Sequence, residues 1–198
     1  KLSIRFEKEE SLAKLKTELK EFDLGGLKAF LPQEVWGYTG TFSGDIRSQW
    51  KEGNRWKEVE AKAELTGKNG QVPTTQFSGK LNTVLSKLVG GDVSDQVALS
   101  NFRRIDLKIG MKEQRLSINE FRFLDKTDSL VLEGKGEISL DEKGKSEIFL
   151  DVKDKKGDLW SRSPEKSLPK VIPLKLAGKH FSLDPDLFYT LNAINKKE

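Results

Sequence analysis

A period-two alternation between apolar and polar residues recurs along most of the chain, and this pattern constrains the fold more than any other feature. It is clearest over residues 129–152, where the polar positions of the alternation include Glu133, Glu137 and Glu147. Successive side chains of a strand point to opposite faces of a sheet, so the pattern predicts a hairpin with one apolar and one charged face, turning at 141–145. Its apolar side carries Leu130, Leu132, Ile138, Leu140, Ile148, Leu150 and Val152.

Two more pairs of strands follow from the same pattern. Residues 104–111 alternate and return over 116–123, where the phase slips, so a bulge is predicted near Asn119 or Glu120. A strand over 38–50 returns over 59–65, and Lys68-Asn69-Gly70 is predicted to end it. The first of these strands carries Tyr38, Phe42, Ile46 and Trp50 on one side.

Glycines stand inside the alternation at several places, which suggests a loose internal repeat of stacked hairpin units. The segments that share this feature are Gly40–Ile46, Phe77–Leu81, Gly134–Ile138 and Leu176–His180.

Helices are expected to be few and short. Apolar spacing predicts one over 81–89, stopped by Gly90-Gly91, and another over 186–194 with an apolar stripe of Leu187, Phe188 and Leu191. A single turn is expected at Gly25–Leu31, before Pro32.

Three segments do not follow the simple alternation. Residues 9–24 fit a helix by spacing and propensity, although Leu15, Thr17 and Leu19 also fit a strand. Residues 154–170 read as a long surface loop. The strand expected over 171–178 contains Pro173, which restricts it to an edge or a strand start.

Composition points to a thin structure. Of 198 residues, 35% are hydrophobic and 33% charged, which suggests a sheet with a narrow core in one elongated domain over 1–198. Leu2–Phe6 already reads as a strand, so the chain is expected to be part of a longer protein whose membrane anchor lies upstream. In isolation this strand is expected to be an exposed edge, which either self-associates or is covered by the chain's own tail, and in the longer protein it is expected to be paired with another strand.

Chemical sites are scarce in the sequence. The chain has no cysteine and one histidine, His180, so thiolate chemistry and a multi-histidine metal site are excluded. Phosphate-loop, dinucleotide and nucleophile-elbow motifs are absent, and no carboxylate stands in an apolar setting. We therefore expect no enzymatic activity, no cofactor and no metal.

Nucleic acid is not an expected partner either, because the 35 basic and 31 acidic residues are closely interleaved. The four tryptophans, at positions 36, 50, 56 and 160, fit packing between strands better than sugar stacking, with Trp56 facing Trp50.

The order of these signals resembles AsmA-like proteins of the Gram-negative envelope, and most closely the type II secretion system protein N branch. The segments that carry the resemblance are Leu15–Leu24, Gly37–Ile46, Ile105–Asn119, Leu130–Leu140 and Pro173–Leu183. One departure concerns the end of the chain. The family often closes with Gly-x-x-x-x-Pro, whereas here six residues separate Gly178 from Pro185.

The resemblance implies a mainly β fold, a curved antiparallel sheet of amphipathic hairpins forming a half-open barrel or trough, with a few short helices. It also implies a strand over most of 13–23. The implied role is that of a non-enzymatic periplasmic accessory component of the type II secretion system, anchored in the inner membrane, or a related role in lipid handling.

The implied partners are envelope proteins of the secretion machinery, lipid acyl chains, or both. The concave face would be lined by Phe42, Ile46, Ile109, Ile118, Leu132, Ile138 and Leu150. Three other interpretations stay open: an ordinary core closed by the short helices, a scaffold that binds proteins through its free strand edge, and a carbohydrate-binding sandwich.

Overall fold

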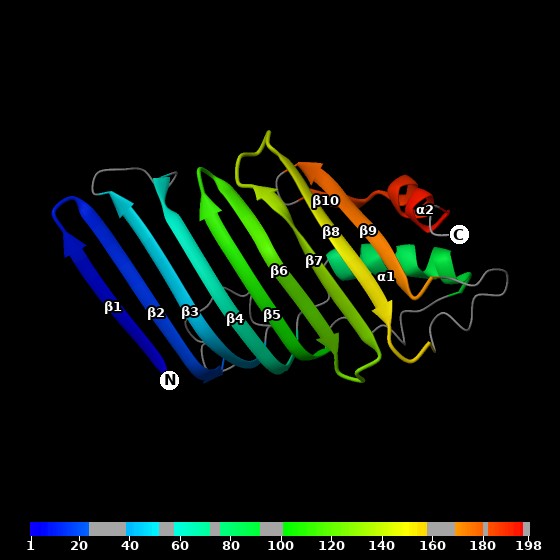
Figure 1. The fold of residues 1–198 in the computed structure, drawn as a ribbon, viewed down its shortest axis with the longest axis horizontal. Coiled ribbons are helices and arrows are strands. Elements are labelled where there is room, and N and C mark those ends of the chain that lie inside the picture. The colour runs from blue at the N-terminus through cyan, green and yellow to red at the C-terminus, as the bar shows by residue number, and fades with distance from the viewer. Residues whose placement is uncertain are drawn as a thin grey trace.

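The fold is one open antiparallel sheet of ten strands that follow one another in chain order (Figure 1). The computed structural model describes residues 1–23, 39–51, 58–71, 76–91, 101–157, 169–179 and 182–195. The strands are β1 (Leu2–Glu9), β2 (Leu12–Asp23), β3 (Thr39–Lys51), β4 (Glu60–Gln71), β5 (Asn101–Lys112), β6 (Arg115–Asp125), β7 (Leu130–Ser139), β8 (Lys145–Asp154), β9 (Val171–Lys179) and β10 (Ser182–Pro185). The predicted fold class, a mainly β sheet that does not close with a few short helices, is confirmed.

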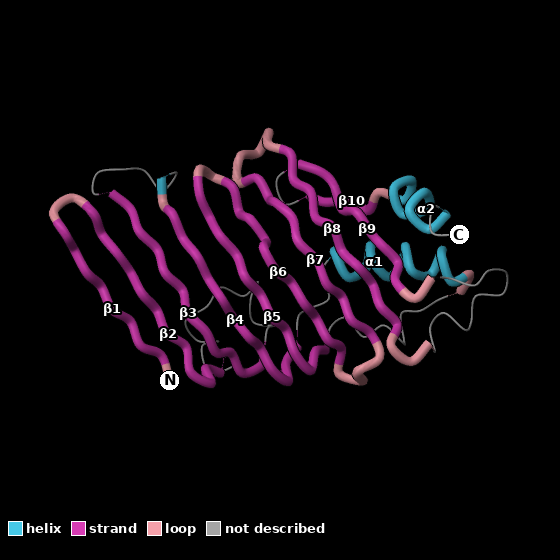
Figure 2. The backbone as a smooth tube through the Cα atoms, in the orientation of Figure 1, coloured by secondary structure: helices cyan, strands magenta, loops and turns pink. Residues whose placement is uncertain are grey.

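Two helices complete the described chain. Helix α1 (Gln76–Val89) lies against one face of the sheet, behind β7–β9 in the view of Figure 1. Helix α2 (Leu187–Asn195) lies at the end of the sheet formed by β9 and β10. Figure 2 shows that both helices belong to this end, while β1 lies at the other.

The ends of the helices have clear local causes. The N–H of Gly90 donates to the carbonyl of Ser86 at 2.9 Å, and its φ of 77° suits glycine, so the predicted stop of α1 is confirmed. The helix begins at Gln76, before the predicted start at 81. Asp186 caps α2, because its Oδ1 accepts a hydrogen bond of 2.9 Å from the N–H of Tyr189.

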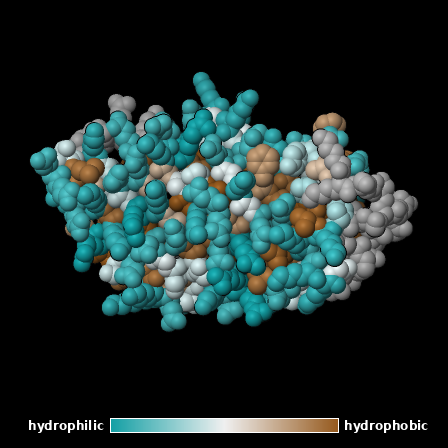
Figure 3. Space-filling model, viewed as in Figure 1, coloured by the Kyte–Doolittle hydropathy of each residue, from teal (hydrophilic) through white to brown (hydrophobic). Residues whose placement is uncertain are grey.

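Strand register gives the sheet two chemically different faces. One row of direct cross-strand partners runs Thr17, Ile46, Ala63, Ile109, Ile118, Gly136, Ile148 and Leu176. The side that carries this row and the parallel rows beside it is called the apolar face. The opposite side, called the polar face, is the one seen in Figure 3, where hydrophilic side chains dominate.

The predicted hairpins are present. Strands β7 and β8 pair from Leu130↔Asp154 to Glu137↔Glu147, and residues 140–144 connect them. The predicted bulge is confirmed, because the register of β6 against β7 shifts between Ile118 and Phe121.

Two sequence-based expectations were wrong, and the ambiguity over residues 9–24 is resolved in favour of the expected strand. Lys68-Asn69-Gly70 does not end β4, which continues to Gln71 because Asn69 adopts a φ of 49° and the pairing with β5 resumes at Gly70. Local helix propensity fails over 9–24, where β2 is held between β1 and β3, as the resemblance implied.

The predicted stripe of α2 is the second error. Phe188 and Leu191 are 77% and 51% exposed, whereas Leu187 and Ile194 pack against the core. Leu187, Thr190 and Ile194 are spaced three and four residues apart, so they share the face of the helix that packs inwards, and Phe188 and Leu191 lie off that face.

Several expectations fall outside the described residues. They concern Gly25–Leu31, Trp36, Tyr38, Trp56, Trp160, His180 and most of the loop predicted over 154–170.

Proline fits the position it occupies in β9. Pro173 pairs with Asp151 of β8, and β10 pairs only with residues 176–179 of β9. At Pro173 the strand therefore has a partner strand on one side only, which satisfies the predicted restriction.

Glycine is required where neighbouring strands approach closely. A Cβ built on Gly44 would lie 2.0 Å from the carbonyl oxygen of Glu64, and Gly44 has a φ of 147°. A Cβ on Gly136 would lie 2.3 Å from the carbonyl oxygen of Glu147. These glycines of the predicted repeat units therefore allow the close backbone contact between adjacent strands.

Candidate functional site

The apolar face is closed at one end of the sheet. Leu85 and Val89 of α1 are 0% and 2% exposed, and they belong to one buried cluster with side chains of β5–β9. Leu132 and Leu150 lie in this cluster at 2% and 3% exposure. These two of the seven predicted groove residues are therefore part of a closed core and offer no surface to a ligand.

The other predicted residues lie on the same face but outside the buried part of that cluster. Ile46, Ile109, Ile118 and Ile138 are all half-buried, and the first three belong to one cross-strand row. Phe42 stands at the border, because it packs against the cluster with its ring 6.1 Å from that of Phe102. The structure therefore brings all seven residues to one face, but α1 closes the cluster over Leu132 and Leu150, whereas the other five lie outside its buried part.

Exposure of the apolar face rises towards β1. Leu2, Ile4 and Phe6 are 43%, 62% and 58% exposed, and Phe6 stacks in a tilted arrangement with Trp50 at 6.3 Å. These three residues extend the apolar face beyond the predicted lining. The alternation over residues 2–6 contained the signal for them, but they were interpreted only as an edge.

The region of the apolar face over which neither described helix packs is long enough for an extended apolar ligand. From β1 to β6 the row through Ile4, Ile46 and Ile109 crosses five inter-strand spacings, or about 24 Å. The side chains are small where β3 meets β4, at Gly44, Ser48, Ala61 and Ala63. The apolar layer is therefore thinnest there, with larger side chains on both sides.

The polar face is covered by ion pairs between strands. Glu133 pairs with Arg122 at 3.3 Å and with Lys153, and Lys175 pairs with Glu147 at 2.8 Å. The hydrogen bond to Glu147 raises the pKa of Lys175. These pairs are partly exposed to solvent, so each contributes little to stability, and together they mark the polar face.

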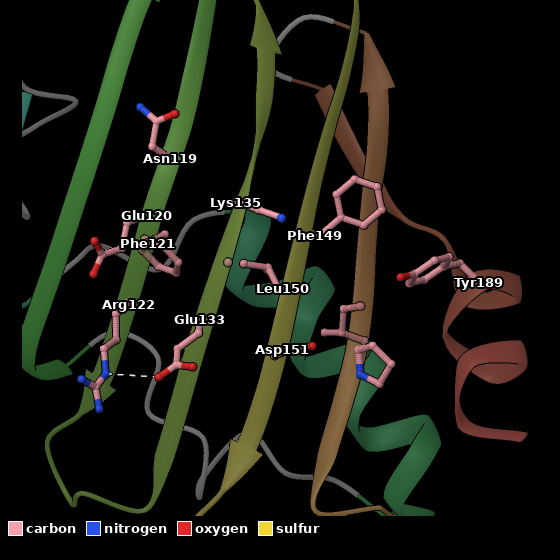
Figure 4. A pocket seen from close by; sticks show the side chains of 13 residues that line it. Asn119, Glu120, Phe121, Arg122, Glu133, Lys135, Phe149, Leu150, Asp151 and Tyr189 are labelled. Carbon is pink, nitrogen blue, oxygen red and sulfur yellow. Dashed lines mark ion pairs between the residues drawn. The ribbon is translucent and has the colours of Figure 1, made fainter. Parts of the chain in front are cut away.

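A hollow of about 460 Å³ lies on the polar face between β6, β9 and α2 (Figure 4). Phe149 and Tyr189 form one wall, with ring centroids 6.0 Å apart in an edge-to-face arrangement. The other lining side chains include charges that are already paired, Arg122 with Glu133 as drawn in Figure 4. Sequence reasoning missed this hollow, and its signal was Phe149, an aromatic residue at a polar position of the alternation.

The buried acid of the described chain has a structural explanation. Asp125 is 2% exposed, and its carboxylate accepts 2.8 Å hydrogen bonds from the N–H groups of Ser129 and Leu130, besides bonds from Thr127. It thereby organises the turn between β6 and β7. Among the described residues no three potential metal ligands gather, and no described helix is long and apolar enough to cross a bilayer.

Comparisons with protein-family models, with curated proteins and with solved structures found no match. The functional argument therefore rests on the residues of this chain and on the geometry above.

Proposed function

We propose that this chain is a non-enzymatic component of the Gram-negative envelope that contacts lipid acyl chains through the part of its apolar face that no described helix covers. The observation that carries the proposal is the contrast within that face, which is buried beneath α1 at one end, whereas over β1–β4 its side chains larger than alanine are half-buried or exposed. The resemblance to AsmA-like proteins supports a periplasmic, inner-membrane-anchored setting and an accessory role in type II secretion.

Physical chemistry favours an acyl chain as the ligand of this face. The row through Ile46 and Ile109 presents aliphatic groups, and its side chains offer no charge to a polar ligand. One leaflet of a bilayer core is about 15 Å deep, so the available length of about 24 Å accommodates one acyl chain. Each methylene buried against this surface would contribute about 0.8 kcal/mol.

Site-specific photo-crosslinking tests the proposal directly. A benzophenone amino acid is placed at Ile46 or Ile109, and the protein is incubated with vesicles of phosphatidylethanolamine and phosphatidylglycerol that carry labelled acyl chains. Labelled lipid should become crosslinked to the protein at both positions. The matched controls are the chain neighbours Arg47 and Lys108, which are exposed on the polar face and should remain unlabelled.

Two results would overturn the proposal. Equal labelling at Ile109 and Lys108 would indicate non-specific collision with the membrane. No labelling at Ile46 or Ile109, in variants that keep the wild-type circular dichroism spectrum, would show that the apolar face does not meet acyl chains.

A further inference from the structure

The two edges of the sheet differ in how they are protected against pairing with another strand. Strand β10 has four residues, ends at Pro185 and is followed at once by α2. Strand β1 has eight residues, contains no proline and pairs with β2 without a register shift. Natural edge strands carry protective features of this kind. Strand β1 has charged side chains, which are one such feature, but it lacks the shortness and the proline of β10, so of the two edges of the described sheet β1 is the more open to strand addition.

The backbone of β1 is oriented for such an addition. The amide of Lys20 donates to the carbonyl of Lys1 at 2.9 Å, which fixes the odd-numbered residues of β1 as those bonded to β2. The N–H and C=O groups of Leu2, Ile4 and Phe6 therefore point to the outer side. The same three residues carry the exposed apolar side chains of the strand.

We propose that β1 pairs with β1 of a second copy of this chain, antiparallel, about a two-fold axis through Ile4 and normal to the sheet. In this register Ile4 lies opposite Ile4 of the second copy, and Leu2 lies opposite Phe6. All six exposed apolar side chains then meet on one face. This inference is independent of the proposed lipid contact, because it uses the edge of the sheet.

The sequence of β1 is complementary to itself in this register. On the polar face Lys1 lies opposite Glu7, and Ser3 lies opposite Arg5, so no like charges meet. An axis through Arg5 would place the two Arg5 side chains opposite each other. An axis through Phe6 would place Ile4 opposite Lys8 and would separate the apolar side chains.

The paired assembly has defined properties. A two-fold axis normal to the sheet keeps both apolar faces on the same side, and the α1-covered ends lie farthest from the junction (Figure 1). The contact involves one strand from each copy, which is small beside the roughly 1,600 Å² of a standard interface. Association should therefore be weak and dependent on concentration.

Disulfide trapping reads the register directly, because the natural chain has no cysteine. Directly opposite residues in a hydrogen-bonded antiparallel pair have Cα atoms about 5.5 Å apart, within the range that a disulfide spans. Under a mild oxidant, Ile4→Cys should give a covalent dimer in much higher yield than Arg5→Cys or Phe6→Cys. A higher yield from either of the latter, or equal yields from all three, would overturn the register.

Sedimentation of the full chain tests the association itself. The dimer fraction should increase with protein concentration in the wild type, and Ile4→Lys should be monomeric throughout, with a Tm lowered by no more than about 4 °C. The matched control is Phe188→Lys, the same change at a 77% exposed site on α2, which should associate like the wild type. A wild-type chain that is monomeric at millimolar concentration would refute the proposal, as would a dimer unaffected by Ile4→Lys.

Discussion

Truncation of Leu132 should destabilise the protein far more than truncation of Ile4, although both residues lie on the apolar face. Leu132 is 2% exposed within the cluster that α1 closes. Leu132→Ala removes buried methyl groups and leaves a cavity, which should lower the free energy of unfolding by about 2–5 kcal/mol.

Ile4 provides the contrast. It is 62% exposed, so about two fifths of its surface leaves water on folding. Full burial of such a side chain is worth about 1.5–3 kcal/mol, so the partial burial is worth roughly 1 kcal/mol, and no cavity forms when it is truncated. Ile4→Ala should therefore lower the free energy of unfolding by at most about 1 kcal/mol.

Urea unfolding followed by tryptophan fluorescence and by circular dichroism measures both variants. The midpoint should shift clearly for Leu132→Ala and only slightly for Ile4→Ala, with the m-value unchanged. Similar shifts would refute the assignment of a closed and an open region to one face.

Three further outcomes follow from the geometry. Gly44→Ala should destabilise the protein by at least about 1 kcal/mol, because the added Cβ would meet the backbone of Glu64 and Gly44 has a positive φ. Gly79→Ala should stabilise it by about 0.5–1 kcal/mol, because the space beside this exposed glycine of α1 is open. Chemical unfolding measures both changes. Asp125→Ala should destabilise by about 1–3 kcal/mol, since it leaves buried N–H groups such as that of Leu130 unsatisfied, and thermal unfolding checks this. Burial raises the pKa of Asp106, but the hydrogen bonds from Arg104 and Thr66 outweigh it and lower the pKa from 3.8. The stability that the ionised Asp106 carboxylate contributes is therefore complete above about pH 4 and is lost as the pH falls further. Asp106→Asn should accordingly lose less stability than the wild type when the pH is lowered below about 4.

The sheet was largely predictable because its signal is local and repeated. Alternation over 129–152 identified both the hairpin and its facing, and a phase slip located the bulge between Ile118 and Phe121. The one long segment that local propensity misassigned, β2, is a strand because β1 and β3 pair with it on both sides. That is an effect of tertiary context, which no single segment contains.

The site was predictable only in part. Parity along each strand correctly placed Ile46, Ile109 and Leu132 on one face, but it could not show that α1 covers Leu132. Cover depends on where a helix packs, and that depends on contacts distant in sequence. For the same reason the hollow beside Phe149 and Tyr189 was missed, since its wall joins two residues that are forty positions apart in the chain.

Native mass spectrometry of the chain after incubation with phosphatidylethanolamine and phosphatidylglycerol vesicles tests the central claim most directly. The account predicts a population whose added mass equals one or a few phospholipids in the wild type. That population should be reduced in Ile109→Ser and unchanged in Lys108→Ser, its neighbour on the polar face. A wild-type spectrum that holds only the bare protein mass, or a lipid adduct equally abundant in both variants, would contradict a lipid-binding apolar face.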